Sequence, residues 1–127
     1  MTTAITNGSP APARIMLVDD NIDALETLAE LLRMYDYEVA TANTPQAAIQ
    51  MVSSFRPQLA ILDIGLPGMD GFQLGTELRC ALGEGAPLRL ITLSGYGRDV
   101  DAQRSAAAGF ERHLVKPLDF DELLRLI

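Results

Sequence analysis

Short apolar runs alternate with amphipathic helical patterns along most of this 127-residue chain, and that alternation limits the folds it can adopt. The runs are Ile15–Val18, Tyr37–Ala42, Leu59–Leu62, Leu88–Leu93 and Phe110–Val115. The first, third and fourth are almost continuously apolar, which is typical of parallel strands that are covered on both faces. Polar residues interrupt the second and the fifth, so we expect these two at the edges of the sheet.

The segments that follow the runs carry helical stripes of apolar residues. Four of them are clear: Ile22–Leu32, Ala48–Phe55, Leu74–Ala81 and Phe120–Ile127. Each follows a residue suited to an N-cap: Asn21, Thr44 (with Pro45 next), Asp70 and Asp119 (in a capping box with Glu122). The stretch Arg98–Ala108 differs because its apolar side is mostly alanine. We expect a helix there to bury the least surface and to move most easily.

Strands that alternate with helices predict five βα units and therefore an α/β fold. Three interior and two edge strands fit a flavodoxin-like (βα)5 architecture. It has a five-stranded parallel sheet of order 2-1-3-4-5, with helices on both faces. In such sheets ligands bind beyond the carboxyl ends of the strands, at the switch point between the first and third.

Length, charge and cysteine content bound the classes of function. The length corresponds to one domain, which we expect over residues 13–127 after a flexible arm over residues 1–12. A net charge of −7 disfavours direct binding of nucleic acid, which depends on neutralising phosphates. No apolar run is long enough to span a membrane and no secretory signal is visible, so we expect a cytoplasmic protein. Cys80 is the only cysteine, which excludes an internal disulfide, and we expect no redox role for it.

Polar side chains follow four of the predicted strands, at the point where each strand ends. Asp19 and Asp20 follow the first strand, and Asp63 follows the third. Ser94 ends the fourth, and Lys116 ends the fifth. The predicted order gathers these residues in one crevice, where three carboxylates and one ammonium leave excess negative charge. Oxygen ligands without histidine or cysteine favour Mg²⁺, and such a site suits a phosphoryl group.

Four motifs lie around these residues: LVDDN at 17–21, LDIGLPGMDG at 62–71, TLSGYG at 92–97 and HLVKP at 113–117. With them the chain closely resembles the receiver domain of two-component response regulators over residues 13–127. The resemblance implies that Asp63 is the phosphoacceptor and a carboxylate nucleophile. It further implies that Asp20, Asp63 and the Gly65 carbonyl bind Mg²⁺, while Asp19 acts mainly through a metal-bound water.

The resemblance also assigns the cationic and hydroxyl groups of the site. Lys116 is expected to pair with the phosphoryl oxygens, and Ser94 is expected to hydrogen-bond one of them after transfer. A cis peptide is expected between Lys116 and Pro117. Family members usually carry tyrosine or phenylalanine as a rotamer switch where this chain has His113. We expect either a weaker or pH-sensitive switch there, or an edge-strand histidine without a signalling role.

The expected partner is a phosphohistidine on a histidine kinase or a histidine phosphotransfer protein. The domain is not expected to be an enzyme beyond its own phosphorylation and dephosphorylation, and it lacks an ATP-binding Walker loop. Phosphorylation is expected to switch the surface of the fourth helix, fifth strand and fifth helix, which is also a possible dimer face. The last helix is short, which is compatible with a longer natural protein. A stand-alone regulator, the first domain of a regulator with an effector domain and the receiver of a hybrid histidine kinase are all compatible with the motifs.

Three other functions were weighed. A Mg²⁺-dependent phosphatase of the haloacid-dehalogenase type needs a second acid two residues after its nucleophile, where this chain has Gly65. A pseudo-receiver that has lost phosphorylation is disfavoured by the complete set of site residues. A flavin-binding protein of the same topology is disfavoured because acids occupy the loop after the first strand. Turnover of a phosphate ester would distinguish the phosphatase from a receiver that labels once.

Overall fold

Five parallel strands form one sheet in the order β2-β1-β3-β4-β5, as predicted. The computed structural model describes residues 13–95 and 99–127. The strands are β1 (Arg14–Val18), β2 (Glu38–Ala42), β3 (Leu59–Asp63), β4 (Arg89–Ser94) and β5 (Arg112–Val115). The two polar strands, β2 and β5, lie at the edges. The flavodoxin-like topology predicted from the sequence is confirmed.

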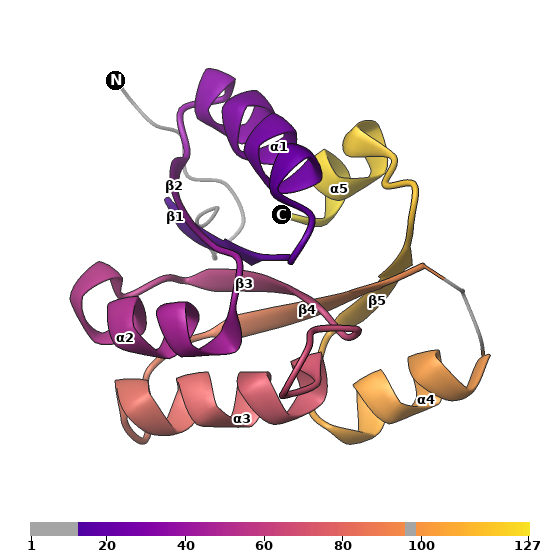
Figure 1. Cartoon of the computed structure of the whole chain (residues 1–127). Coiled ribbons are helices and arrows are strands. Elements are labelled where there is room, and N and C mark those ends of the chain that lie inside the picture. The colour runs from indigo at the N-terminus through magenta and orange to yellow at the C-terminus, as the bar shows by residue number, and fades with distance from the viewer. Residues whose placement is uncertain (1–12, 96–98) are drawn as a thin grey trace.

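Five helices cover the two faces of the sheet, α1 and α5 on one side and α2, α3 and α4 on the other (Figure 1). They are α1 (Ile22–Met34), α2 (Pro45–Phe55), α3 (Gly71–Leu82), α4 (Asp99–Ala107) and α5 (Phe120–Leu126). The four predicted N-caps are confirmed, because the side chains of Asn21, Thr44, Asp70 and Asp119 each accept a hydrogen bond from the first turn. Local side-chain chemistry therefore sets where these helices begin.

Continuous apolar strands supply two cores. Met16, Leu62 and Leu90 face α2 and α3, whereas their neighbours Leu17 and Ile61 face α1 and α5. All five are at most 1% exposed. Covering on both faces explains why the interior strands carry no polar alternation.

The last strand is shorter than predicted, and Phe110 explains the difference. Phe110 is buried before the strand begins, where its ring lies against Phe72 with the centroids 5.8 Å apart. Its N–H donates to the carbonyl of Ser105 at the end of α4. The apolar character at this position serves packing between a loop and α3, and β5 starts only at Arg112.

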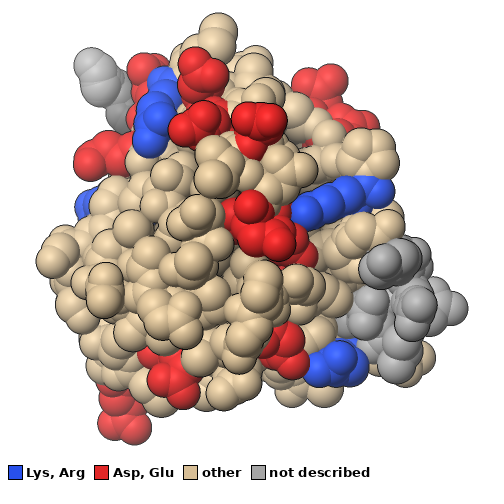
Figure 2. Space-filling model, viewed as in Figure 1, with Lys and Arg blue, Asp and Glu red and all other residues tan. Residues whose placement is uncertain are grey.

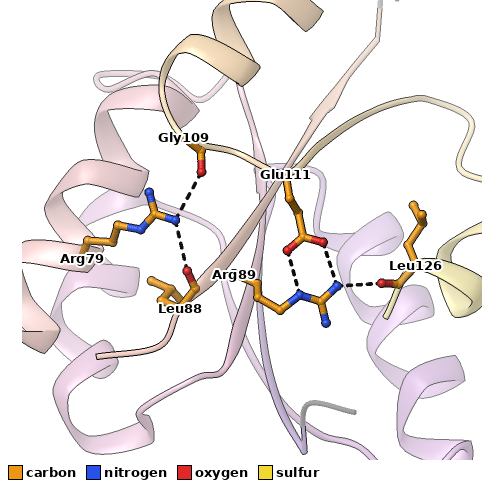
Figure 3. Close-up of polar contacts among 6 residues, drawn as sticks. All are labelled: Arg79, Leu88, Arg89, Gly109, Glu111 and Leu126. Carbon is orange, nitrogen blue, oxygen red and sulfur yellow. Dashed lines mark hydrogen bonds and ion pairs between the residues drawn. The ribbon is translucent and has the colours of Figure 1, made fainter. Parts of the chain in front are cut away.

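Two arginines join the loops at the amino end of the sheet (Figure 3). Arg79 donates to the carbonyls of Leu88 and Gly109. Arg89 forms a bidentate pair with Glu111 at 2.7 and 2.8 Å and also donates to the Leu126 carbonyl. The hydrogen bond with Glu111 outweighs burial and raises the pKa of Arg89. Both of these arginines thus have acceptors of their own.

Two predictions fall wholly or partly on segments that are not described. The arm predicted over residues 1–12 lies outside the described residues, as does the Tyr96–Gly97 end of the third motif. Among the described helices, none combines the length and the hydropathy needed to cross a bilayer.

Candidate functional site

The carboxyl ends of the parallel strands bring the predicted site residues to one edge of the sheet. Asp19 and Asp20 directly follow β1, and Asp63 is the last residue of β3. Lys116 directly follows β5 beside Ser94, whose carbonyl accepts from the Lys116 N–H at 2.8 Å. Acidic side chains gather in the middle of this face, with a basic side chain beside them (Figure 2). Residues up to 97 positions apart in the sequence thus meet because four strands end together.

Three carboxylates are close enough to share one cation. Asp19, Asp20 and Asp63 each offer an oxygen, and these three atoms all lie within 4.8 Å of one another. Asp19 and Asp63 are 6% and 7% exposed, whereas Asp20 is exposed. A set of carboxylate oxygens that is partly open to solvent fits a hard divalent cation such as Mg²⁺, which keeps several of its waters.

Lys116 is the cation within this acidic group. Its Nζ lies 2.9 Å from Oδ2 of Asp19 and 3.0 Å from Oδ2 of Asp63. Burial alone would lower the pKa of Lys116, but the hydrogen bonds and negative charges of the two carboxylates outweigh it, so that the pKa is raised. The ammonium is thus held charged at neutral pH, at a point equidistant from two of the three acids.

Backbone amides orient the two buried carboxylates. Oδ1 of Asp63 accepts from the Gly65 N–H at 2.8 Å, and Oδ1 of Asp19 accepts from the Asn21 N–H at 3.0 Å. In each case the second oxygen, Oδ2, is the one that meets Lys116. Both carboxylates are therefore fixed by a local turn on one oxygen and by a distant residue on the other.

Gly71 is a residue of the site that sequence analysis missed. A Cβ at this position would lie 2.8 Å from the Asp63 carbonyl oxygen and 2.9 Å from the Ile64 Cα. Helix α3 therefore begins in close contact with the backbone that carries Asp63. The only available signal was its position at the end of the second motif, directly after the N-cap Asp70.

His113 and the peptide before Pro117 were also predicted from the resemblance. The Lys116–Pro117 peptide is cis, as expected. His113 lies on β5 opposite Thr92 of β4, and its Nδ1 is 2.7 Å from Oγ1 of Thr92. It is half-buried, and its side-chain hydrogen bond is made to Thr92 rather than to the three carboxylates.

Taken together, the fold and the site define an α/β protein of flavodoxin-like topology whose strand ends carry an acidic, lysine-containing site. Residues 15–127 match the family model described as the response regulator receiver domain. The chain belongs to the response regulator receiver family, whose members are phosphoacceptors of two-component signalling.

Individual relatives agree with this assignment. The chain is 34% identical over 113 residues to a 14.6 kDa protein of Leptolyngbya boryana, covering 89% of this chain and 86% of that protein. It is 34% identical over 116 residues to the response regulator MprA of Mycobacterium leprae, covering 90% of this chain but 49% of MprA. The chain thus spans about half the length of this longer relative. A CheY-like receiver domain structure from Methanospirillum hungatei superposes with a TM-score of 0.80 at 28% identity, covering 91% and 90% of the two chains.

The phosphatase alternative is not supported. The matched family and relatives are receivers and response regulators. The position two residues after Asp63 is Gly65, whose N–H donates to the Asp63 carboxylate. A glycine provides no general acid for the leaving group of a phosphate ester.

Proposed function

We propose that this domain receives a phosphoryl group on Asp63 from the phosphohistidine of a histidine kinase or a histidine phosphotransfer protein. The observation that carries the proposal is the contact between Asp63 and Lys116 at 3.0 Å, beside two further carboxylates. A nearly buried carboxylate with a cation on one oxygen is a preorganised acceptor for an anionic group.

The donor set supports Mg²⁺ as the cofactor. The carboxylates of Asp20 and Asp63 and the carbonyl of Gly65 would hold the ion, with Asp19 acting mainly through a metal-bound water. Asp20 is the exposed member of the cluster, whereas Asp19 is already engaged by Lys116 and Asn21. When bound, the ion supplies positive charge that offsets the carboxylates and the oxygens of the transferring phosphoryl group.

The residues of the chain would perform the transfer as follows. A carboxylate oxygen of Asp63 forms a bond to phosphorus while the bond from phosphorus to the donor imidazole nitrogen breaks, and the electron pair leaves with the imidazole. The ammonium of Lys116 would pair with the phosphoryl oxygens, because it already contacts the acceptor carboxylate of Asp63. Ser94, buried at the end of β4, would hydrogen-bond one of these oxygens once the acyl phosphate exists.

The new hydrogen bond at Ser94 provides a route to an output surface made by α4, β5 and α5. Among side chains 103–107 of α4 only Ser105 is buried, so little apolar surface anchors this part of the helix. A shift between two arrangements from 1:99 to 99:1 needs about 5.5 kcal/mol of differential stabilisation. A few charge-assisted hydrogen bonds in a partly dry site supply energy of that order. Val115, which is 47% exposed on β5, supports this surface as a contact face for a partner or a second copy.

An apolar groove beside the acidic site supports docking of a protein donor rather than of a free nucleotide. The groove has a volume of about 410 Å³ and lies between α1 and the start of α5. Leu28, Leu31 and Phe120 line it, and Asp19 and Lys116 stand at its edge. A donor that covered this groove would bring its phosphohistidine next to Asp63 and exclude water from the transfer.

The experiment is to incubate the chain with acetyl phosphate and Mg²⁺ and to measure intact mass. We expect one phosphoryl group per chain, removable by hydroxylamine as an acyl phosphate, and none without Mg²⁺. Asp63→Asn should abolish labelling, whereas the matched control Asp121→Asn, on the exposed surface of α5, should label fully. Labelling that persists in Asp63→Asn, or its absence from the wild-type chain, would overturn the proposal.

A further inference from the structure

Three polar side chains meet where α4 lies on β4 and β5. Oγ1 of Thr92 is 2.9 Å from Oγ of Ser105 and 2.7 Å from Nδ1 of His113. Thr92 is 0% and Ser105 is 1% exposed. Each of the three residues comes from a different element, namely β4, α4 and β5. In the part of α4 whose side chains are described, residues 103–107, the buried contact with the sheet is therefore polar, whereas α3 packs through buried leucines.

The hydrogens of this cluster can be arranged in two directions. In one, the Nδ1–H of His113 donates to Thr92, Thr92 donates to Ser105, and Ser105 donates to the Arg112 carbonyl at 3.4 Å. In the other, Ser105 donates to Thr92, and Thr92 donates to Nδ1. Either arrangement uses both hydroxyl protons. In both, Nε2 of His113 is buried without a hydrogen-bond partner among the described residues, which is unfavourable for a polar atom.

Among the described side chains of α4, the other contacts are exposed. Arg104 lies 3.5 Å from Asp70 and 4.5 Å from the centroid of the Phe72 ring, and its side chain is 54% exposed. Such exposed pairs contribute little free energy. In the described part of α4, the buried side-chain contact with the sheet is thus the one made by Ser105.

We propose that Thr92, Ser105 and His113 form a hydrogen-bonded latch that fixes α4 on β4 and β5 and links its position to Ser94. Thr92 and Ser94 are two residues apart on β4, so both side chains point to the face that α4 covers. A displacement of Ser94 therefore acts on the strand segment that carries the centre of the latch. This linkage to phosphorylation rests on the proposed function, whereas the latch itself does not.

The latch also gives His113 a definite role in the unphosphorylated state. Its ring is held inward by Thr92, so it acts as a connector between β5 and α4 rather than as a freely turning side chain. A phenylalanine would fill similar space but has no atom that hydrogen-bonds Thr92. His113→Phe therefore removes the bond while it keeps the ring.

The latch is tested by amide hydrogen exchange of the unphosphorylated chain in chelator. Thr92→Val and Ser105→Ala should each speed exchange of the α4 amides about fivefold, the equivalent of about 1 kcal/mol for one lost hydrogen bond. Exchange in α3 should stay unchanged. Thr41→Val, a threonine of the edge strand β2 outside the latch, is the matched control and should leave α4 unchanged.

His113 provides an independent readout because it is the only histidine of the chain. In long-range proton–nitrogen NMR spectra, Thr92→Val should shift the Nδ1 resonance of His113, and Thr41→Val should leave it in place. The latch would be overturned if the α4 amides exchanged at the same rate in Thr92→Val, Ser105→Ala and the wild type. It would also be overturned if Thr92→Val left the Nδ1 resonance of His113 unshifted.

The linkage to Ser94 has its own test. Acetyl phosphate with Mg²⁺ should change α4 exchange in the wild-type chain, and His113→Phe should reduce that change at least twofold. If Asp63 is labelled and the change is the same in both chains, the linkage is wrong. If Asp63 is not labelled but the chelator results hold, the proposed function fails and the latch stands.

Discussion

Charged side chains are arranged in opposite ways at the two ends of the sheet. At the amino end, Arg89 has the carboxylate of Glu111 in bidentate contact, and Arg79 donates to two carbonyls (Figure 3). At the carboxyl end, three carboxylates lie together, and among the described residues Lys116 is the one basic side chain in contact with them. Arg89 is balanced by a carboxylate of the chain itself, whereas the acidic cluster is left with excess negative charge.

This difference distinguishes charged groups that stabilise the fold, such as Arg89 and Glu111, from the three carboxylates that we propose bind a cation. Clustered carboxylates repel one another, so their arrangement costs stability until a cation is added. A balanced pair such as Arg89 and Glu111 gains nothing from an added ion. The carboxyl end is therefore where the proposed binding of a cation and a phosphoryl group is expected to change the free energy of unfolding most.

The largest expected effect is that of removing the cation at each end. Lys116→Met leaves Asp19 and Asp63 buried without their shared partner, and we expect a loss of about 2 kcal/mol in the free energy of unfolding without Mg²⁺. Arg89→Met leaves Glu111, whose side chain is 38% exposed, and the Leu126 carbonyl without the guanidinium, and it should cost less than about 1 kcal/mol. Urea unfolding at neutral pH in chelator measures both.

Equal losses in the free energy of unfolding of the two methionine variants would contradict this difference between the two ends of the sheet. They would mean that the carboxylates at the carboxyl end relax into solvent as easily as Glu111 does. A loss seen only in Arg89→Met would mean that the cation at the amino end contributes more to stability.

A smaller effect is expected from the acidic cluster itself. Asp20→Asn removes one repelling charge, so in chelator it should be more stable than wild type by about 0.5–1 kcal/mol, a few degrees in melting temperature. Mg²⁺ should raise the melting temperature of wild type and should raise that of the variant less. Thermal unfolding with and without Mg²⁺ tests this, with Glu30→Gln on the exposed face of α1 as the charge-matched control. If Glu30→Gln gains as much stability as Asp20→Asn, then net charge rather than the cluster is responsible.

The smallest expected effect concerns pH at the amino end. The hydrogen bond from Arg89 lowers the pKa of Glu111 below its usual value of 4.5. A carboxyl with a lowered pKa in the folded state stabilises the fold above its unfolded pKa, and this contribution is lost as the pH falls through the folded pKa. Because both side chains are exposed by more than a third, the contribution is below about 1 kcal/mol.

Comparison of wild type with Glu111→Gln isolates this contribution. We expect the variant to be less stable than wild type at pH 7, and we expect the gap to close as the pH falls through the lowered pKa of Glu111, as followed by urea unfolding over a series of acidic pH values. A gap that stays constant with pH would show that the amide replaces the carboxylate or that packing alone is lost.

Much of the fold was predictable because its signals are local. Asn21, Thr44 and Asp70 each cap a helix with a side chain that accepts from the backbone N–H only three residues ahead. The interior strands were visible because burial on both faces removes polar residues from them. Phe110 misled the prediction of the last strand, since an apolar residue in a loop carries the same signal as one in a strand.

The sequence by itself determined the alternation of strands and helices, the helix starts and the presence of acids, a hydroxyl and a lysine after four strands. The tertiary structure decided which oxygens share Lys116, that Gly71 must be small beneath Asp63, and that Thr92, Ser105 and His113 meet under α4. The physical reason is the distance along the sequence over which each interaction acts. Caps and strand periodicity depend on neighbours a few residues away, whereas these contacts join residues brought together only when separate strands lie side by side in the sheet.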